Sequence, residues 1–230
     1  MAVMTTQRIE VIRVPEPIGY AEMLEAQRTW RTAVEERRAP SALFLLEHTP
    51  VITLGRNAQA EHVLQTQDEL AQAGVELIET DRGGGVTYHG PGQLVAYPVL
   101  DLTQWRCSVG WYLRSLEEVV IRLLSTYGLT GERLEGYTGV WVNGAKVAAI
   151  GVGVHQWVTF HGTAINVCPD MAHFGLIVPC GIADKPVTSL RQLLGAEAPT
   201  VAEVMDAFER EFLAYFRAAP EDVPRPGKEE

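Results

Sequence analysis

The hydrophobic and polar residues of this chain follow two different periods. Alternating or short apolar stretches predict strands at Arg8–Val14, Ala42–Leu46, Val51–Leu54, Val75–Ile78, Leu94–Leu100 and Thr159–Val167. Apolar residues three or four positions apart predict helices at Tyr20–Arg38, Asp68–Ala73, Val201–Phe216 and from the N-cap Ser108 to about Tyr127. The connection Glu47–Pro50 is short, so we expect the two strands that flank it to pair with each other.

A two-residue turn signal, Asn143-Gly144, separates Val140–Val142 from Lys146–Val154. An Asn-Gly pair suits a tight turn whose central residues both have positive φ, so these segments predict a β-hairpin. Strands outnumber helices, and hairpins alternate with single helices. The pattern therefore predicts an α+β fold in which helices flank a mixed, largely antiparallel sheet.

The length and composition are those of one ordinary globular domain: 230 residues, 47% hydrophobic and 21% charged. We expect a single domain over residues 1–217 and a disordered, Pro-rich tail over residues 218–230. No apolar stretch is long enough to span a membrane and no signal peptide is recognisable, so we expect a cytoplasmic protein without a membrane partner. The net charge of −10 argues against nucleic acid as a partner.

The least ordinary segment is Asp81–Gln93, with the sequence DRGGGVTYHGPGQ. Glycines allow the backbone to bend and to approach a ligand closely, and their N–H groups can hold anionic or carbonyl oxygens. The glycines alone fit a long hairpin turn equally well. Because Arg82, Tyr88 and His89 lie among them, we favour a ligand-binding loop. A P-loop and a dinucleotide-binding loop are excluded, since GK[ST] is missing and no helix follows.

The three cysteines are an odd number without CxxC spacing, which argues against a disulfide framework and against a cysteine-rich zinc site. A single cysteine is most often a small buried apolar residue, and Cys168, at the end of a strand, fits that interpretation. Cys107 precedes a helix whose dipole lowers a thiol pKa, so it is one candidate nucleophile. Cys180 is the other, because Pro179 fixes its approach and Gly181 leaves space beside its sulfur.

The chain has only three lysines, and Lys146 opens the apolar strand KVAAIGVGV. It is either the solvated end of a hairpin or a cation placed beside a thiol. In the second case it would stabilise the thiolate, since a thiol with a pKa near 8.5 is only about 3% ionised at pH 7. His161, within another strand, is more often a satisfied core histidine than a catalyst.

Four motifs in this order and spacing, RGGGVTYHGPGQ, AKVAAIG, FHGTAINV and PCGI, resemble the lipoyl(octanoyl) transferases. The resemblance covers about Phe44 to Arg191 and implies the fold of the biotin and lipoate protein ligases. It also implies an acyl-thioester on Cys180, with the thiol pKa lowered by Lys146. The substrate-binding residues that it implies are Arg82, Gly83, Gly84, Gly85, Val86, Thr87, Tyr88, His89, Ala149, Ile150, Gly151, Gly162, Thr163 and Ala164.

The resemblance implies transfer of an octanoyl group from octanoyl-acyl carrier protein to a lysine of a lipoyl domain, without a cofactor or a metal. The implied acceptors are the E2 subunits of 2-oxoacid dehydrogenases and the H protein of glycine cleavage. We expect the acyl tail to follow the small residues of the strand Val147–Val154. Two alternatives stay open: an ATP-dependent lipoate-protein ligase, and a non-catalytic protein that binds acyl carriers or lipoyl domains.

Overall fold

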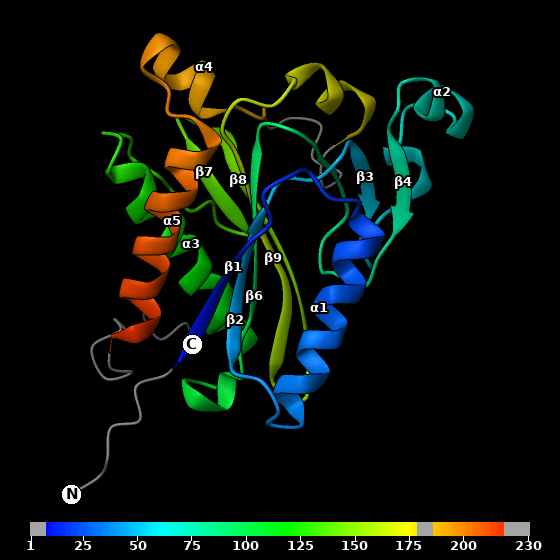
Figure 1. The fold of residues 1–230 in the computed structure, drawn as a ribbon. Coiled ribbons are helices and arrows are strands. Elements are labelled where there is room, and N and C mark those ends of the chain that lie inside the picture. The colour runs from blue at the N-terminus through cyan, green and yellow to red at the C-terminus, as the bar shows by residue number, and fades with distance from the viewer. Residues whose placement is uncertain (1–7, 179–185, 219–230) are drawn as a thin grey trace, which may run out of the picture.

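The computed structural model describes residues 8–178 and 186–218, and its centre is a six-stranded sheet (Figure 1). In spatial order the strands are β1 (Ile9–Arg13), β2 (Ser41–Leu46), β6 (Gln93–Val99), β9 (Val158–Asn166), β8 (Ala145–His155) and β7 (Gly139–Val142). Strands β1 and β2 run parallel, and the other neighbours in this sheet run antiparallel. The predicted α+β class with a mixed, largely antiparallel sheet is confirmed.

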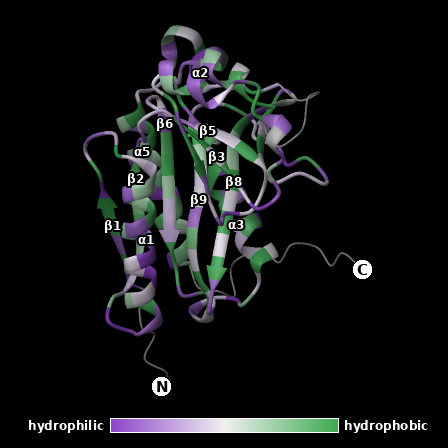
Figure 2. Ribbon diagram, turned by 90° about the vertical axis from the view of Figure 1, so that its right-hand side faces the viewer, coloured by the Kyte–Doolittle hydropathy of each residue, from purple (hydrophilic) through white to green (hydrophobic). Residues whose placement is uncertain are grey.

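Helices cover both faces of this sheet. Helix α1 (Tyr20–Glu35) lies on one face, while α3 (Val109–Ser125) and α5 (Val201–Arg217) lie on the other (Figure 1). Successive side chains of a strand point to opposite faces, so Leu45 packs toward α3 and α5 whereas Phe44 packs in the α1 core. Figure 2 shows hydrophobic colour along much of β6 and β8, between these helices.

A second, three-stranded sheet lies beside the first. Its order is β4 (Glu76–Glu79), β3 (Val51–Leu54) and β5 (Val86–His89), with the short helix α2 (Gln67–Gln72) nearby. It has a small core of its own, which includes Ile52 and Leu70. The remaining elements are short: α4 (Leu190–Leu194) and the 3₁₀ turns Ala60–His62, Leu102–Gln104, Met171–Leu176 and Gly195–Glu197.

Most predicted elements are present within a few residues of their expected bounds. Ser108 caps α3 by accepting a hydrogen bond from the N–H of Trp111, and Asn143 and Gly144 have the positive φ values, +52° and +78°, of the expected hairpin turn. Helix α1 ends at Glu35 instead of Arg38, because Arg37 has left the helical region with φ +57°.

The expected pairing of the strands on either side of Glu47–Pro50 is wrong. Strand β2 lies between β1 and β6 of the large sheet, whereas β3 lies between β4 and β5 of the small one. The connection does not fold back on itself because it pairs with the segment before α1. The Ile18 N–H donates to Glu47 O, and the Thr49 N–H donates to Ile18 O. As a result, the connection crosses from β2 in the large sheet to β3 in the small sheet.

The glycine-rich segment is not a loop throughout, since its second half forms strand β5, paired antiparallel with β3. The strand was not predicted because three consecutive glycines, Gly83–Gly85, directly precede it and favour a loop. The expected single domain over residues 1–217 stays a prediction. Of the expected tail, residues 218–230, all but Ala218 lie outside the described residues. Within residues 8–178 and 186–218, no helix is long and apolar enough to span a membrane.

Gly162 of β9 provides a test of how closely the strands pack. A Cβ atom there would overlap the backbone carbonyl oxygen of Ala96 on β6. We expect Gly162→Ala to lower the free energy of unfolding by about 3 kcal/mol, because the backbone of the sheet must shift. Gly19, whose Cβ position is open, is the control, and Gly19→Ala is expected to change stability by less than about 1 kcal/mol. Equal effects of the two substitutions in urea denaturation would contradict this packing.

Candidate active site

A pocket opens between the α1 face of the large sheet and the glycine-rich segment. Eleven of the residues that the sequence assigns to substrate binding line it: Arg82, Gly83, Gly84, Thr87, His89, Ala149, Ile150, Gly151, Gly162, Thr163 and Ala164. Lys146 and Thr138 lie at its rim on the hairpin side, and Tyr20, Val95, Tyr97 and His161 complete the lining. The described part of the predicted site is therefore largely brought together.

The glycine-rich segment rests on the outer edge of β8. Strand β7 pairs with β8 only as far as Ala149, which leaves the Val152 carbonyl to accept a hydrogen bond from the Gly83 N–H at 2.9 Å. The approach is close, since a Cβ on Gly151 would lie 2.7 Å from the Gly83 oxygen. Gly84 then turns the chain with φ +86°, a conformation that favours glycine.

Arg82 anchors the segment to the small sheet. Its guanidinium donates to the backbone oxygen and to the hydroxyl of Thr53 on β3, both at 2.8 Å, and to the Gly83 oxygen at 3.0 Å. The side chain is buried, and a planar guanidinium with several donors is suited to holding strand β3 and the glycine-rich segment in one arrangement. Arg82 therefore shapes the pocket wall as well as placing a positive charge there.

Strand alternation divides the other residues of the segment. Thr87 and His89 face the pocket, whereas Val86 and Tyr88 point into the core of the small sheet. The Tyr88 hydroxyl makes a hydrogen bond of 2.9 Å with His173 Nδ1. The prediction that all of Arg82–His89 binds substrate is therefore wrong for the side chains of Val86 and Tyr88, because side chains alternate between the two faces of a strand.

Lys146 is buried, so its interpretation as a solvated hairpin end is wrong. Its ammonium lies 4.8 Å from the centre of the Trp141 ring and 3.5 Å from the Thr138 carbonyl oxygen. Both contacts favour a cation, the first through the ring quadrupole. Its backbone N–H donates to Pro186 O at 2.8 Å, and its carbonyl accepts from Thr188 N.

A second, more open cleft begins where the pocket ends. The two share Gly83, Gly84, Thr138, Lys146, Ile150 and Gly151. On its far side the cleft is lined by Val109 and Leu113 of α3, by Tyr137, and by Arg56 and Asn57, and Gly85 belongs to it as well. Lys146 therefore lies at the junction of an inner pocket and an outer cleft.

The exposure of the cysteines differs from what the sequence led us to expect. Cys180 lies outside the described residues. Cys107 and Cys168 are both exposed, so the expected burial of Cys168 is wrong. Strand β9 ends at Asn166, and the Cys168 N–H then donates to Gly92 O in a turn that directs its side chain outward.

Three buried histidines form what we call the floor of the pocket: His89 and His161 belong to its lining, and the ring of His48 packs against the lining residues Tyr20 and Tyr97. His48 accepts from the Tyr97 hydroxyl at 2.8 Å because its other ring nitrogen donates to Ile18 O. His161 donates to Asp81 at 2.9 Å, consistent with a satisfied core histidine. Burial lowers the pKa of both rings to about 4, and burial, with His48 and Arg82 adding to it, lowers the pKa of His89 well below 6.5. The floor is therefore neutral imidazole at pH 7.

Several residues of this site were not among those predicted from the sequence. Tyr97 and Val95 alternate on the α1 face of β6, and that period of two could have identified them. Thr138 and Trp141, which hold Lys146, carry no local signal, because their contact with it depends on the strand pairing. Among residues 8–178 and 186–218, no three histidine, cysteine or carboxylate side chains are arranged to hold a metal ion.

Comparison with known proteins agrees with this architecture. Residues 19–213 match the family described as the lipoyl protein ligase A/B catalytic domain. The fold also resembles a bipartite lipoate protein ligase from Thermoplasma acidophilum, with a TM-score of 0.71, 19% identity, and coverage of 91% of this chain and 83% of that one. A biotin protein ligase from Aquifex aeolicus gives a TM-score of 0.57 at 14% identity, over 93% of this chain and 72% of that one. The fold is that of the lipoate and biotin ligase catalytic domains.

Two relatives are similar over nearly their full length. The octanoyltransferase of Chloroflexus aggregans is 51% identical over 206 residues, covering 88% of this chain and 93% of that protein. The octanoyltransferase of Gloeobacter violaceus is 50% identical over 201 residues, with coverage of 86% and 88%. The chain belongs to the octanoyltransferase family within the lipoyl protein ligase A/B catalytic domains, as the resemblance predicted, and it is an enzyme.

The histidine floor makes stability depend on pH. The folded rings of His48 and His161 take up protons only near pH 4, whereas the unfolded chain takes them up near pH 6.5. The unfolded state therefore binds more protons in this window, and the free energy of unfolding should fall as the pH is lowered from about 6.5 to 4. Urea denaturation across this range should give a shallower slope for His48→Gln. A free energy that stays constant from pH 6.5 to 4.5 would contradict the buried neutral rings.

Proposed function

We propose that the chain takes an octanoyl group from octanoyl-acyl carrier protein, holds it as a thioester on Cys180, and passes it to a lysine of a lipoyl domain. As a member of the octanoyltransferase family, it transfers octanoyl groups in protein lipoylation. The carrier donor, the cysteine intermediate and the acceptors, which are lipoyl domains of E2 subunits and the H protein, are the proposed part. A cytoplasmic site of action is proposed from the sequence.

The reaction has two balanced halves. The Cys180 thiolate attacks the thioester carbonyl, the bond from carbonyl carbon to carrier sulfur breaks, and the carrier leaves as a thiol after taking up a proton. The acceptor amine then attacks the Cys180 thioester, an amide forms, a proton leaves the nitrogen, and the Cys180 thiolate is restored. The first half exchanges one thioester for another, and the second half converts a thioester into a more stable amide, so neither half requires ATP.

The observation that carries this proposal is the buried ammonium of Lys146 at the junction of pocket and cleft. Six residues after Cys180 in the sequence, Pro186 accepts the Lys146 N–H. The chain that follows the cysteine is thus anchored to the lysine. A unit charge about 4 Å from a thiolate is worth up to about 4 kcal/mol at an effective dielectric constant near 20. That is enough to make the thiolate a major species at pH 7.

One wall of the inner pocket is apolar, as the binding of an acyl chain requires. Its lining comes from neighbouring strands, with Ala149 on β8, Ala164 on β9 and Val95 on β6. Val147, Ala148 and Val152, by contrast, face the opposite core. We therefore propose that the tail lies across these three strands, instead of along β8 as the sequence led us to expect. Six methylenes at roughly 0.8 kcal/mol each supply about 5 kcal/mol of binding free energy.

The glycine-rich segment is proposed to stabilise the oxyanion of each half-reaction. The Gly83 N–H already donates to Val152 O, so the donors must be other N–H groups of the segment. The outer cleft would then hold the arm that links the thioester to its carrier. Val109, Leu113 and Tyr137 offer apolar contacts there, and the arm would reach the carbonyl beside Lys146.

The two alternatives make different demands. A ligase would activate its substrate with ATP and need no cysteine, and a binding protein would form no product. The relatives at about 50% identity are octanoyltransferases, whereas the lipoate ligase similarity is at 19% identity and concerns the fold. Membership of the octanoyltransferase family excludes a non-catalytic binding protein, and intact mass separates the cysteine route from ATP-dependent ligation.

The intermediate is tested by intact mass. Incubation with octanoyl-acyl carrier protein should add one octanoyl group to the protein, and Cys180→Ser should abolish both this adduct and the transfer. Cys107→Ser and Cys168→Ser, which alter exposed thiols, should retain the adduct. Product formation by Cys180→Ser would support a ligase or a different nucleophile. Loss of the adduct in Cys107→Ser alone, with the protein still folded, would assign the nucleophile to Cys107.

The position of the acyl chain is tested by filling the pocket. Gly151→Val is unsuitable because its Cβ would displace the Gly83 carbonyl. Ala149→Val should instead slow octanoyl transfer more than butanoyl transfer, since the added methyl groups occupy space that only the longer chain needs. The ratio of the two kcat/KM values, measured on one folded variant, is its own control. An unchanged ratio would contradict this location.

A further inference from the structure

A buried carboxylate on α3 reaches the peptide group that holds Lys146. Glu117 is fully buried, and its Oε1 accepts a hydrogen bond from the Gly139 N–H at 3.2 Å. The Lys146 ammonium donates to the Thr138 carbonyl at 3.5 Å. The Thr138 carbonyl and the Gly139 N–H belong to one peptide group, so the carboxylate and the ammonium hold its two ends.

This peptide group has little freedom to move. Gly139 has φ +139°, and a Cβ there would lie 2.7 Å from the Ala148 oxygen and 3.4 Å from Cε of Lys146. The residue is thus packed between β8 and the lysine side chain. An anion at the N–H end polarises the peptide, which makes its carbonyl oxygen a stronger acceptor for the ammonium.

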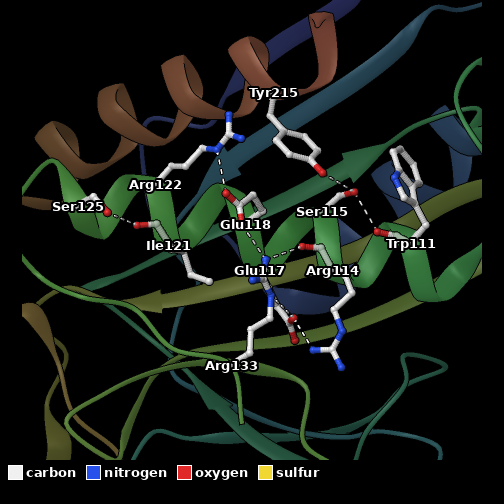
Figure 3. Close-up of polar contacts among 10 residues, drawn as sticks. All are labelled: Trp111, Arg114, Ser115, Glu117, Glu118, Ile121, Arg122, Ser125, Arg133 and Tyr215. Atoms are coloured by element: carbon white, nitrogen blue, oxygen red, sulfur yellow. Dashed lines mark hydrogen bonds and ion pairs between the residues drawn. The ribbon is translucent and has the colours of Figure 1, made fainter. Parts of the chain in front are cut away.

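Two arginines offset the cost of burying Glu117. Its Oε2 accepts from Arg114 at 2.7 Å and from Arg133 at 3.2 Å, as Figure 3 shows, while Oε1 remains directed at Gly139. A buried carboxylate is stable only with such partners. The arginines account for the stability of the charge, but they do not explain why it faces the peptide that binds the lysine.

We propose that Glu117 is a positioning residue for acyl transfer, which acts on Lys146 through the Thr138–Gly139 peptide group. It fixes where the ammonium lies, and it increases the negative charge on the carbonyl that the ammonium meets. The catalytic consequence rests on the proposed function of Lys146, whereas the effect on the position of the lysine does not.

The neighbouring residue provides a matched control. Glu118 pairs with Arg133 at 2.8 Å and with Arg122 at 3.1 Å, so it belongs to the same ion-pair network (Figure 3). Unlike Glu117, it is partly exposed, and its carboxylate pairs with the two arginines and not with the Thr138–Gly139 peptide group. If Glu117 served only to hold the Arg133 side chain against α3, then Glu117→Gln and Glu118→Gln would have the same effect on the protein.

Three variants separate the effect of the negative charge at residue 117 from the effect of its contact with the Gly139 N–H. Glu117→Gln keeps the length and removes the charge, Glu117→Asp keeps the charge for the arginines but withdraws it from Gly139, and Glu118→Gln is the control. The first measurement is NMR of protein labelled with ¹³C-lysine, in which three lysines give three ε-carbon signals that Lys146→Arg assigns. We expect both Glu117 variants to move the Lys146 signal and to accelerate amide exchange at Gly139, and Glu118→Gln to do neither.

The second measurement is octanoyl transfer. We expect kcat to fall about tenfold in both Glu117 variants, equivalent to about 1.4 kcal/mol, with KM for the acceptor nearly unchanged. Wild-type signals and rates in Glu117→Asp would overturn the proposal, because arginine pairing would then suffice. If Glu117→Gln does not fold, the aspartate variant alone decides. Moved NMR signals with an unchanged kcat would leave the positioning intact and contradict the proposed role of Lys146 instead.

Discussion

The backbone of Gly83 lies on the outer edge of β8, and the geometry of the site depends on this contact. Strand β8 is longer than its partner β7, so the Val152 carbonyl is left for the Gly83 N–H. The contact is possible because Gly151 has no side chain to separate the two backbones. Arg82, held by Thr53, fixes the other side of the same segment. Together they hold the small sheet beside the large one and leave the pocket between the glycine-rich segment and the large sheet.

A second constraint is the burial of positive charge. An ammonium removed from water needs compensating partners, and Lys146 has the Trp141 ring and the Thr138 carbonyl beside it. Its backbone meanwhile receives the chain that follows Cys180, through Pro186 and Thr188. One residue thus joins the wall of the pocket, the mouth of the cleft and the segment that follows the proposed nucleophile. In such a position a fixed charge can act on both of the proposed half-reactions.

Local sequence signals predicted most elements, because caps, turns and periods are properties of neighbouring residues. Ser108 and Asn143-Gly144 are examples, and both behave as expected. The signals failed where distant pairing decides the outcome. Strands β2 and β3 diverge because Ile18 pairs with the connection between them, and β5 forms because β3 lies beside it.

For the site, too, the sequence predicted what neighbouring residues determine and not what contacts between distant segments determine. Motif order identified the glycine-rich segment, the Ala149–Gly151 and Gly162–Ala164 backbones, and Lys146, most of which line one pocket. It could not show that Val86 and Tyr88 face away, that Cys168 is exposed, or that Lys146 is buried. Those facts depend on strand alternation and on contacts across the sheet. Glu117, which is distant in sequence from the lysine, carries no motif at all.

We propose that the Lys146 ammonium lowers the pKa of the Cys180 thiol, and this effect can be measured directly. In a Cys107→Ser/Cys168→Ser background, Cys180 is the only thiol, so the pH dependence of iodoacetamide alkylation reports on it alone. We predict that Lys146→Ala raises the alkylation midpoint toward about pH 8.5, the pKa of an unperturbed cysteine. The same midpoint with and without the lysine, in a folded protein, would contradict it.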